Sequence, residues 1–345
     1  MKNVILILLI TLISVINSYA QDYADEILLN MKVYTSIQEA LDNPNDVSVL
    51  DLSNRNLSAI PSQLTQFQNL KVLYLQGNNI NQLPDFISKL QQLRHLYLDG
   101  NNIGQLPNSI INLKYLRRFS MANNKLSDFS VLIDCSSLES INLSGNNISK
   151  IPSTISNLSS LKELDISFNK ISDINPALFK LSKLEVLMMS HNNISVLPTG
   201  FVNLKNLKVL FLDGNKFSDI RNICSISSLQ RLSISNCNIT TISQLIGKMT
   251  NLKRLNLSYN KLSTFTLEIT NLTNLEYLDI SNNNITSIPN KISNLSKLYD
   301  FNLCNNSLNT FPELLQNIES LKHIGLSGNS RVMYPPMLDY EREIY

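Results

Sequence analysis

The sequence predicts an α/β solenoid, a curved stack with a parallel concave sheet of about thirteen strands and short helices or 3-10 turns on its convex side. The first observation is an eleven-residue phrase, L-x-x-L-x-L-x-x-N-x-L, that recurs thirteen times. The second is its spacing, because ten of the twelve intervals are 23 residues and two are 22. Copies begin at residues 47, 70, 93, 116, 138, 161, 184, 207, 229, 252, 275, 298 and 321. A fixed period of this size is typical of folds that stack one supersecondary unit on the next.

Each copy is predicted to contain one short strand, because L-x-L alternates with a period of two. Successive side chains of a strand point to opposite faces. In the second copy, Leu73 and Leu75 are expected to point into the core and Tyr74 to point outward. At about 4.8 Å per strand, the stacked copies make a sheet roughly 60 Å long.

The second half of each copy is predicted to be the crossover that a parallel sheet requires. In residues 83–90 the apolar side chains recur so that they return to the core, and Pro84 fits the start of a short helix. The crossover takes more room than the strand, so the stack is expected to curve with the sheet on the inside.

The asparagine of the phrase is predicted to form a ladder along the arc. Its side chain carries both amide donors and a carbonyl acceptor, so it can satisfy backbone groups of its own and the neighbouring repeat. Arg55 takes this place in the first copy and Cys237 in the ninth. Arg55, and Arg331 in the last copy, indicate atypical end repeats, as a stack that must stop requires.

The first twenty residues are typical of a secretory signal peptide. Lys2 precedes a mostly apolar run over 4–16, and small residues lead to an expected cleavage after Ala20, which leaves Gln21 first. A helix over that run would be about 20 Å long, short of the roughly 30 Å hydrocarbon core. An uncleaved anchor is the alternative. We expect a protein that is secreted, at the cell surface or periplasmic, without stable membrane insertion after cleavage.

The remaining segments are predicted to close the stack. A signal peptide over 1–20 is followed by an N-terminal helical cap over 21–46, a repeat domain over 47–331 and a C-terminal cap or tail over 332–345. Within the first cap, residues 36–41 follow the S-x-x-E capping-box pattern and predict a short helix. A second small helix over 23–31 is a further possibility.

The four cysteines are expected to be free, mostly buried thiols. They are Cys135, Cys224, Cys237 and Cys304. Their places in the repeat separate them, whereas a disulfide needs Cα atoms within about 7 Å.

The chain offers little chemistry for catalysis, so we expect no enzyme and no cofactor. His95, His191 and His323 lie in separate repeats, which favours surface histidines over a metal site. None of the common nucleophile, zinc or phosphate-loop motifs occurs in the sequence. Basic and acidic residues are interleaved at a net charge of +2, which favours neither nucleic acid nor an anionic membrane as the main partner.

With these residues the chain resembles leucine-rich repeat proteins, and specifically the 23-residue class with L-P-x-x-I in the crossover. An apolar residue followed by proline, the first two residues of L-P-x-x-I, occurs seven times and is called here the apolar-proline step. The prolines are Pro61, Pro84, Pro107, Pro152, Pro198, Pro289 and Pro312. The signal peptide and residues 39–44 are similar to exported bacterial members. The resemblance implies non-enzymatic binding of a protein or peptide ligand through the concave face, although members bind very different partners.

The outward residues of the strands predict where such a ligand binds. The central column of the concave face is mostly polar, with Asp51, Ser120, Asn142, Asp165, Ser233, Asn256, Asp279 and Asn302. Two apolar groups interrupt it, and exposed apolar groups bordered by charge often mark binding sites. The principal predicted site consists of Val186, Met188, Val209 and Phe211, bordered by Glu163, Asp165 and Asp213. The second consists of Tyr74 and Tyr97 with Val72 and His95.

The alternative for both groups is ordinary cross-strand packing of a sheet face. The function that we expect is an exported, monomeric recognition protein. An intracellular-type signalling scaffold and a structural envelope component with the same repeats are the alternatives. A repeat-bearing enzyme would need a catalytic domain of about 100 residues or more, for which the repeats leave no room.

Overall fold

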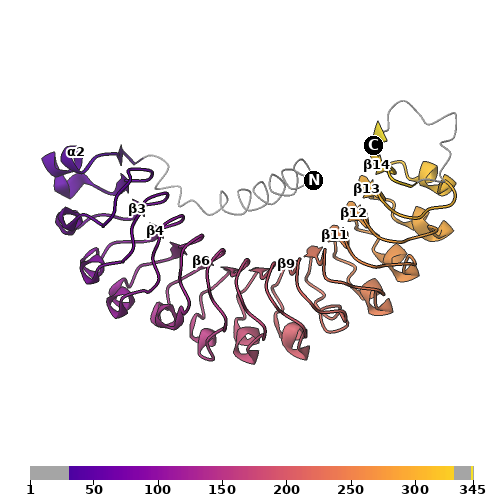
Figure 1. Ribbon diagram of the computed structural model, residues 1–345, viewed down its shortest axis with the longest axis horizontal. Helices are drawn as coiled ribbons and strands as arrows, with labels where there is room; N and C mark the ends of the chain where they lie inside the picture. The colour runs from indigo at the N-terminus through magenta and orange to yellow at the C-terminus, as the bar shows by residue number, and fades with distance from the viewer. Residues whose placement is uncertain (1–30, 330–342, 345) are drawn as a thin grey trace.

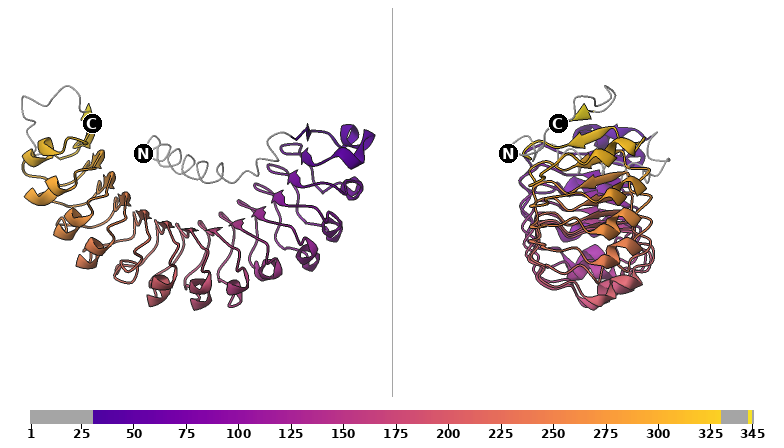
Figure 2. Two further views of the ribbon diagram at one scale, coloured as in Figure 1. Left: turned by 180° about the vertical axis from the view of Figure 1, so that it is seen from behind. Right: turned by 90° about the vertical axis from the view of Figure 1, so that its right-hand side faces the viewer.

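The strands follow one another in chain order along one curved parallel sheet. The computed structural model describes residues 31–329 and 343–344, and all fifteen of its strands belong to that sheet. Figure 1 shows an open arc with the strands on the inner side and the crossovers on the outer side. Figure 2 shows the arc from behind and end-on, where the repeats stack as successive layers. The predicted solenoid and its sense of curvature are confirmed.

Each of the thirteen copies of the phrase contributes one three-residue strand. These are β2 (Val49–Asp51), β3 (Val72–Tyr74), β4 (His95–Tyr97), β5 (Arg118–Ser120), β6 (Ser140–Asn142), β7 (Glu163–Asp165), β8 (Val186–Met188), β9 (Val209–Phe211), β10 (Arg231–Ser233), β11 (Arg254–Asn256), β12 (Tyr277–Asp279), β13 (Asp300–Asn302) and β14 (His323–Gly325). Two-residue strands, β1 (Val33–Tyr34) and β15 (Glu343–Ile344), extend the sheet at its ends.

The pairing register follows the repeat. Leu73 lies beside Leu96 and Leu96 beside Phe119, so the core residue of each strand stacks on its equivalent in the next. Leu73 and Leu75 have no solvent exposure, while Tyr74 between them is only partly covered. The predicted strand phase is therefore confirmed.

The convex side is made of short 3-10 helices. They are η1 (Pro44–Asp46), η2 (Ser62–Gln66), η3 (Asp85–Lys89), η4 (Asn108–Asn112), η5 (Ser130–Asp134), η6 (Ile155–Asn157), η7 (Pro176–Lys180), η8 (Thr199–Asn203), η9 (Gln244–Lys248), η10 (Leu267–Asn271), η11 (Asn290–Asn294) and η12 (Glu313–Asn317). The prolines of the apolar-proline step precede six of them as N-cap residues, namely Pro61, Pro84, Pro107, Pro198, Pro289 and Pro312. Proline fits here because its fixed φ starts the turn and its missing N–H would have no helical partner.

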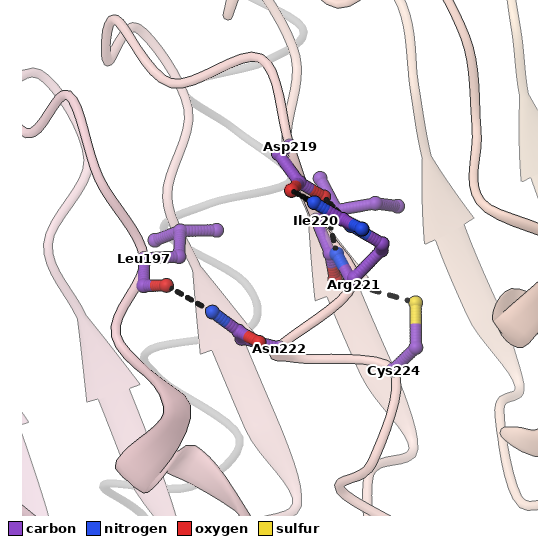
Figure 3. Close-up of polar contacts among 6 residues, drawn as sticks. All are labelled: Leu197, Asp219, Ile220, Arg221, Asn222 and Cys224. Atoms are coloured by element: carbon purple, nitrogen blue, oxygen red, sulfur yellow. Dashed lines mark hydrogen bonds and ion pairs between the residues drawn. The ribbon is translucent and has the colours of Figure 1, made fainter.

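One crossover departs from this pattern, between β9 and β10. It belongs to a 22-residue interval and consists of turns over 221–225 in place of a 3-10 helix. Arg221 pairs with Asp219 at 2.6 Å, and the Asn222 amide donates to the Leu197 carbonyl of the preceding repeat at 2.6 Å (Figure 3). A side-chain bridge to the neighbouring crossover thus replaces the lost helical turn.

The asparagine ladder is present. Asn169 shows the pattern: its Nδ2 donates to the carbonyls of Leu143 and Ile166 at 3.0 and 3.1 Å, and its Oδ1 accepts from Ile148 N–H at 2.9 Å. Buried asparagines hold the same place in eleven repeats, namely Asn78, Asn101, Asn124, Asn146, Asn169, Asn192, Asn215, Asn260, Asn283, Asn306 and Asn329. Each links two strands through backbone groups that would otherwise be buried without a partner.

A short helix covers the core of the first repeat, as the capping-box pattern predicted. Helix α2 (Ile37–Asp42) begins after Ser36, whose hydroxyl accepts the Glu39 N–H at 3.4 Å. Ala40 is fully buried against the core. Arg55, in the ladder position, donates through Nη2 to the carbonyl of Thr35 in this cap at 3.0 Å. Residues 1–30 and 330–342 lie outside the described residues, so the expected signal peptide, second small helix and Arg331 stay predictions.

All four cysteines are free and buried, as the repeat register predicted. Within the described part of the chain, no helix is long and apolar enough to cross a membrane.

Candidate ligand-binding face

Several polar side chains in the central column of the concave face accept hydrogen bonds from the backbone that follows their strand. Asp51 accepts from the N–H of Ser53 at 2.8 Å, and Asn142 accepts from the N–H of Ser144 at 3.0 Å. Asp and Asn side chains commonly close turns in this way. These carboxylates and amides therefore hold the turn that follows each strand, and only their remaining acceptor sites are available to a ligand.

The predicted principal site is much less exposed than the sequence indicated. The exposed fractions are 3% for Val186, 1% for Val209 and 9% for Phe211, and only Met188 is partly exposed. Neighbouring parallel strands lie about 4.8 Å apart, so outward side chains in adjacent repeats contact and cover one another. The four residues do lie together, but as a second small core on the concave face. The expectation of an open apolar patch is wrong.

The acids beside this cluster are engaged as well. Asp165 is half-buried and accepts from Ser167 N–H at 2.9 Å, and burial raises the pKa of its carboxyl. Asp213 accepts from Ser235 N–H at 2.7 Å and from the Ser190 hydroxyl at 3.2 Å. Both carboxylates therefore already hold hydrogen bonds within the sheet face.

The second predicted site keeps a usable surface. Tyr74 and Tyr97 are partly exposed and stack with ring centroids 5.0 Å apart and planes 6° apart. His95 meets the Tyr97 ring edge-on, with centroids 6.4 Å apart. With 5% exposure, His95 is buried, so the prediction of a surface histidine is wrong here. Burial is the main cause that raises the pKa of both tyrosines, which keeps the hydroxyls protonated and able to donate.

A charged hollow adjoins this tyrosine pair. Its volume is about 240 Å³. It is lined by His95, Arg117, Arg118, Glu139, Ser140, Lys162 and Glu163. These residues come from four consecutive repeats, at the first strand position and the position before it. Three cations and two carboxylates therefore face one depression, which shares His95 with the tyrosine pair.

The charges of the hollow are arranged in pairs. Lys162 contacts Glu139 at 2.7 Å, and Ser140 donates its hydroxyl to Glu163 at 2.9 Å. Burial raises the pKa of Glu163, while Ser140 and Arg118 oppose the rise. Arg118 also opposes the raised pKa of Tyr97, and it pairs in register with His95 on the neighbouring strand. A ligand that reaches Arg118 can thus contact an aromatic ring and a cation together.

The prediction missed the hollow because it considered mainly the central column. The missing signal was the pair of consecutive basic residues, Arg117 and Arg118, just before a core residue. A second missed feature lies near the far end, where the Arg254 guanidinium is 3.8 Å from the centroid of the Tyr277 ring. Tyr277 and Tyr299 are neighbours, and His323 lies 3.3 Å from the Tyr299 hydroxyl.

Neither group of residues resembles a metal site. Among the residues that the structure describes, no three His, Cys, Asp or Glu side chains are grouped so that they could hold a metal ion.

Models of one protein family match most of the repeats. The model described as "Leucine-rich repeat region" matches residues 46–140 and 214–333, more than half of the chain. The chain belongs to the leucine-rich repeat family. Models described as "Leucine rich repeat" and "Leucine Rich repeats (2 copies)" match residues 159–217 and 136–178. No curated protein sequence matches the chain significantly.

Solved leucine-rich repeat structures share the fold. A Leptospira interrogans leucine-rich repeat protein is 26% identical, with a TM-score of 0.67 over 91% of this chain and 99% of that protein. A Listeria monocytogenes internalin is 24% identical, with a TM-score of 0.79 over 89% and 92%. The ectodomain of the Arabidopsis thaliana receptor kinase GASSHO1/SCHENGEN3, in complex with Casparian strip integrity factor 2, is 24% identical with a TM-score of 0.53 over 86% and 43%.

Proposed function

We propose that this leucine-rich repeat chain is an exported, non-enzymatic recognition protein that binds a protein or peptide ligand on its concave face. The observation that carries the proposal is the tyrosine pair beside the charged hollow. Tyr74, Tyr97 and Arg118 offer partly exposed rings and a cation next to a depression of about 240 Å³. Tyrosine and arginine are the residue types that most often dominate protein interfaces.

The apolar cluster of Val186, Met188, Val209 and Phe211 becomes a secondary contact in this proposal. Its ligand surface is limited to Met188, because the other three side chains are covered. A ligand that follows the arc from the tyrosine pair would reach Met188 after crossing the hollow, since β5, β6 and β7 lie between them. The ligand proposed here is therefore an extended segment.

The nature of the partner follows from the same surface. The hollow mixes three cations with two carboxylates, and such a mixture fits a polypeptide better than the uniformly charged backbone of a nucleic acid. The protein is expected to act as a monomer, with the ligand supplied by another molecule.

The test uses one variant in each part of the face. The partner that co-purifies with residues 21–345 is identified by mass spectrometry, and its affinity is then measured by calorimetry. Tyr97→Ser places in this repeat the residue that Ser120 supplies in the next one, so the strand itself is preserved. We expect a loss of roughly 2 kcal/mol or more, the magnitude typical of a central interface residue.

Met188→Ser is the matched variant for the secondary contact, and it is expected to cost less. Phe211 is unsuitable, because a polar residue in its buried position would disturb the fold. Circular dichroism and thermal unfolding provide the folding control for both variants. If both keep full affinity, the ligand does not use the concave face. A partner that proves to be RNA or DNA would overturn the proposed ligand class.

Export is part of the proposal and has its own measurement. The apolar run over 4–16 and the small residues before Gln21 support cleavage after Ala20. N-terminal peptide mass spectrometry of the exported protein should find Gln21 first. An intact chain that begins with Met1 and sediments with membranes would instead favour an uncleaved anchor.

A further inference from the structure

The residue before each ladder position has a left-handed backbone in all thirteen repeats. Glycine or asparagine, which tolerate positive φ, holds ten of these places: Asn54, Gly77, Gly100, Asn123, Gly145, Gly214, Asn236, Asn282, Asn305 and Gly328. Three repeats carry larger side chains there, Phe168, His191 and Tyr259, with φ of 52°, 52° and 54°. A bulky residue in this conformation is strained, and such strain concentrates at functional positions. We call the column of these thirteen residues, one before each ladder position, the turn edge.

Two of the large residues are neighbours and form a ring pair. The rings of Phe168 and His191 stack, with centroids 4.3 Å apart and planes 15° apart. Both residues are exposed, Phe168 to 51%. Side chains of this column lean toward the next repeat. A β-carbon built on Gly214 would lie only 2.5 Å from Nδ1 of His191, so that glycine leaves room for the imidazole.

Phe168 keeps half of its surface in solvent although its ring stacks on His191. On the other side, the amide of Asn123 leans over Gly145, where a β-carbon would lie 2.4 Å from its Oδ1. Phe168 therefore presents aromatic surface to solvent on a backbone that would be more relaxed with asparagine. Protein folding alone does not require a phenylalanine here, since ten other repeats use glycine or asparagine in the same place.

Lysines accompany the ring pair along the same edge. The position after the ladder residue alternates between asparagine and lysine: Asn102, Lys125, Asn147, Lys170, Asn193, Lys216, Asn238, Lys261 and Asn284. Lys170 and Lys216 are exposed, and they donate to Asn147 and Asn193 one repeat earlier at 2.7 and 2.9 Å. These bonds place the Lys170 ammonium at the repeat before Phe168 and the Lys216 ammonium at the His191 repeat.

The turn edge and the alternating column carry only neutral or basic side chains around the ring pair. The positions of the turn edge and of the alternating column contain no acidic residue from 123–125 to 259–261.

We propose that the turn edge at Phe168 and His191 is a second interaction surface, distinct from the concave face, that binds an extended acidic polypeptide segment carrying aromatic side chains. An aromatic side chain of the ligand packs on the exposed surface of Phe168. Lys170 and Lys216 lie two strands apart, so their separation along the edge is about 10 Å. An extended chain advances roughly 3.3 Å per residue, so acidic residues three positions apart match the two lysines.

The experiment uses labelled synthetic peptides and fluorescence anisotropy with the full repeat chain. The probe is a peptide of repeating Glu-Tyr-Ser triplets. Repeating Glu-Ala-Ser removes the ring, and repeating Lys-Tyr-Ser reverses the charge. The structure predicts that only the first peptide binds well, and that its affinity falls as salt is raised.

Phe168→Asn is the decisive variant, because asparagine is the residue that the fold itself prefers in this column. The variant should unfold at the same or a higher temperature than the wild type, yet bind the Glu-Tyr-Ser peptide about tenfold more weakly, a change of roughly 1.4 kcal/mol. Tyr259→Asn makes the same replacement in the same column, away from the ring pair, and should leave affinity unchanged.

Charge and location are tested in the same assay. Lys170→Glu should weaken binding about tenfold, whereas Lys261→Glu, in the equivalent place four repeats on, should not. Tyr97→Ser removes half of the tyrosine pair on the concave face. A loss of peptide binding in Tyr97→Ser but not in Phe168→Asn would overturn the turn-edge proposal while supporting the concave one. Equal binding of Glu-Ala-Ser, or no binding of Glu-Tyr-Ser, would also overturn it.

Discussion

The thiol of Cys237 donates to the carbonyl oxygen of Leu212 at 3.3 Å, where the neighbouring repeats use an asparagine amide. It also reaches the carbonyl of Ser235 at 3.3 Å, and its own N–H donates to Asn260 at 3.0 Å. Burial raises the pKa of this thiol to about 12, so it stays a protonated donor at neutral pH. A cysteine thus maintains the donor side of the ladder but supplies no carbonyl acceptor.

Replacement of Cys237 should therefore depend on what the new side chain donates. Cys237→Ala removes the donor and leaves buried carbonyls without it, at a cost of roughly 1–3 kcal/mol. Cys237→Asn should restore both sides of the ladder and leave stability equal or higher. Urea unfolding followed by circular dichroism measures both. A stable alanine variant would mean that the thiol contributes nothing to the ladder.

The four thiols should be unreactive until the protein unfolds. Burial raises the pKa of Cys135 to about 11 and that of Cys224 to about 12, so the reactive thiolate is scarce at neutral pH. Iodoacetamide at pH 8 should label the native protein slowly, and in denaturant it should label four thiols without prior reduction. Mass spectrometry counts the labels. If only two thiols were labelled before reduction, a disulfide would be present.

Stability should depend on the inward residues of the strands. Leu164 has no solvent exposure, and Leu164→Ala should cost roughly 2–5 kcal/mol, as other large-to-small changes in cores do. Ser159→Ala, an exposed change at the end of the preceding repeat, should stay within about 0.5 kcal/mol. Guanidinium titration of both variants measures the difference. Similar losses would show that Leu164 is not a core residue.

The half-buried Asp165 should weaken the fold at neutral pH. Burial raises the pKa of its carboxyl above the ordinary value of 3.8, so the unfolded chain ionises more easily than the folded one. The contribution of this group to stability therefore falls as pH rises above 3.8. Asp165→Asn keeps an acceptor for Ser167 and should raise the unfolding temperature at pH 7.

The same variant provides its own pH control. At pH 3, which is below the ordinary value of 3.8, the carboxyl is mostly protonated in both states, so the advantage of asparagine should largely disappear. Asp165→Ala lacks the acceptor and should be less stable than Asp165→Asn at every pH. Thermal scans between pH 3 and 8 measure these differences. A constant difference between wild type and Asp165→Asn would contradict the assigned pKa effect.

The candidate site was predictable only in part. Alternation identified Tyr74, Tyr97, Met188 and Phe211 as outward residues, because that depends only on strand geometry. Alternation does not predict how exposed these side chains are, because exposure depends on the side chains of the neighbouring repeat, about 23 residues away. Phe211 packs with Val186 and Val209 and is buried, whereas the tyrosine pair is partly exposed to solvent.

The sequence by itself determined the architecture, because the repeated phrase states locally which residues are inward, where each strand ends and which asparagine links the layers. Tertiary structure alone decided which surfaces are open. Arg118 and Glu163 come from β5 and β7, yet they line one hollow. Phe168 and His191 stack because parallel strands bring equivalent residues of adjacent repeats together. The shape and charge of a surface are properties of several repeats together, and no single copy of the phrase contains them.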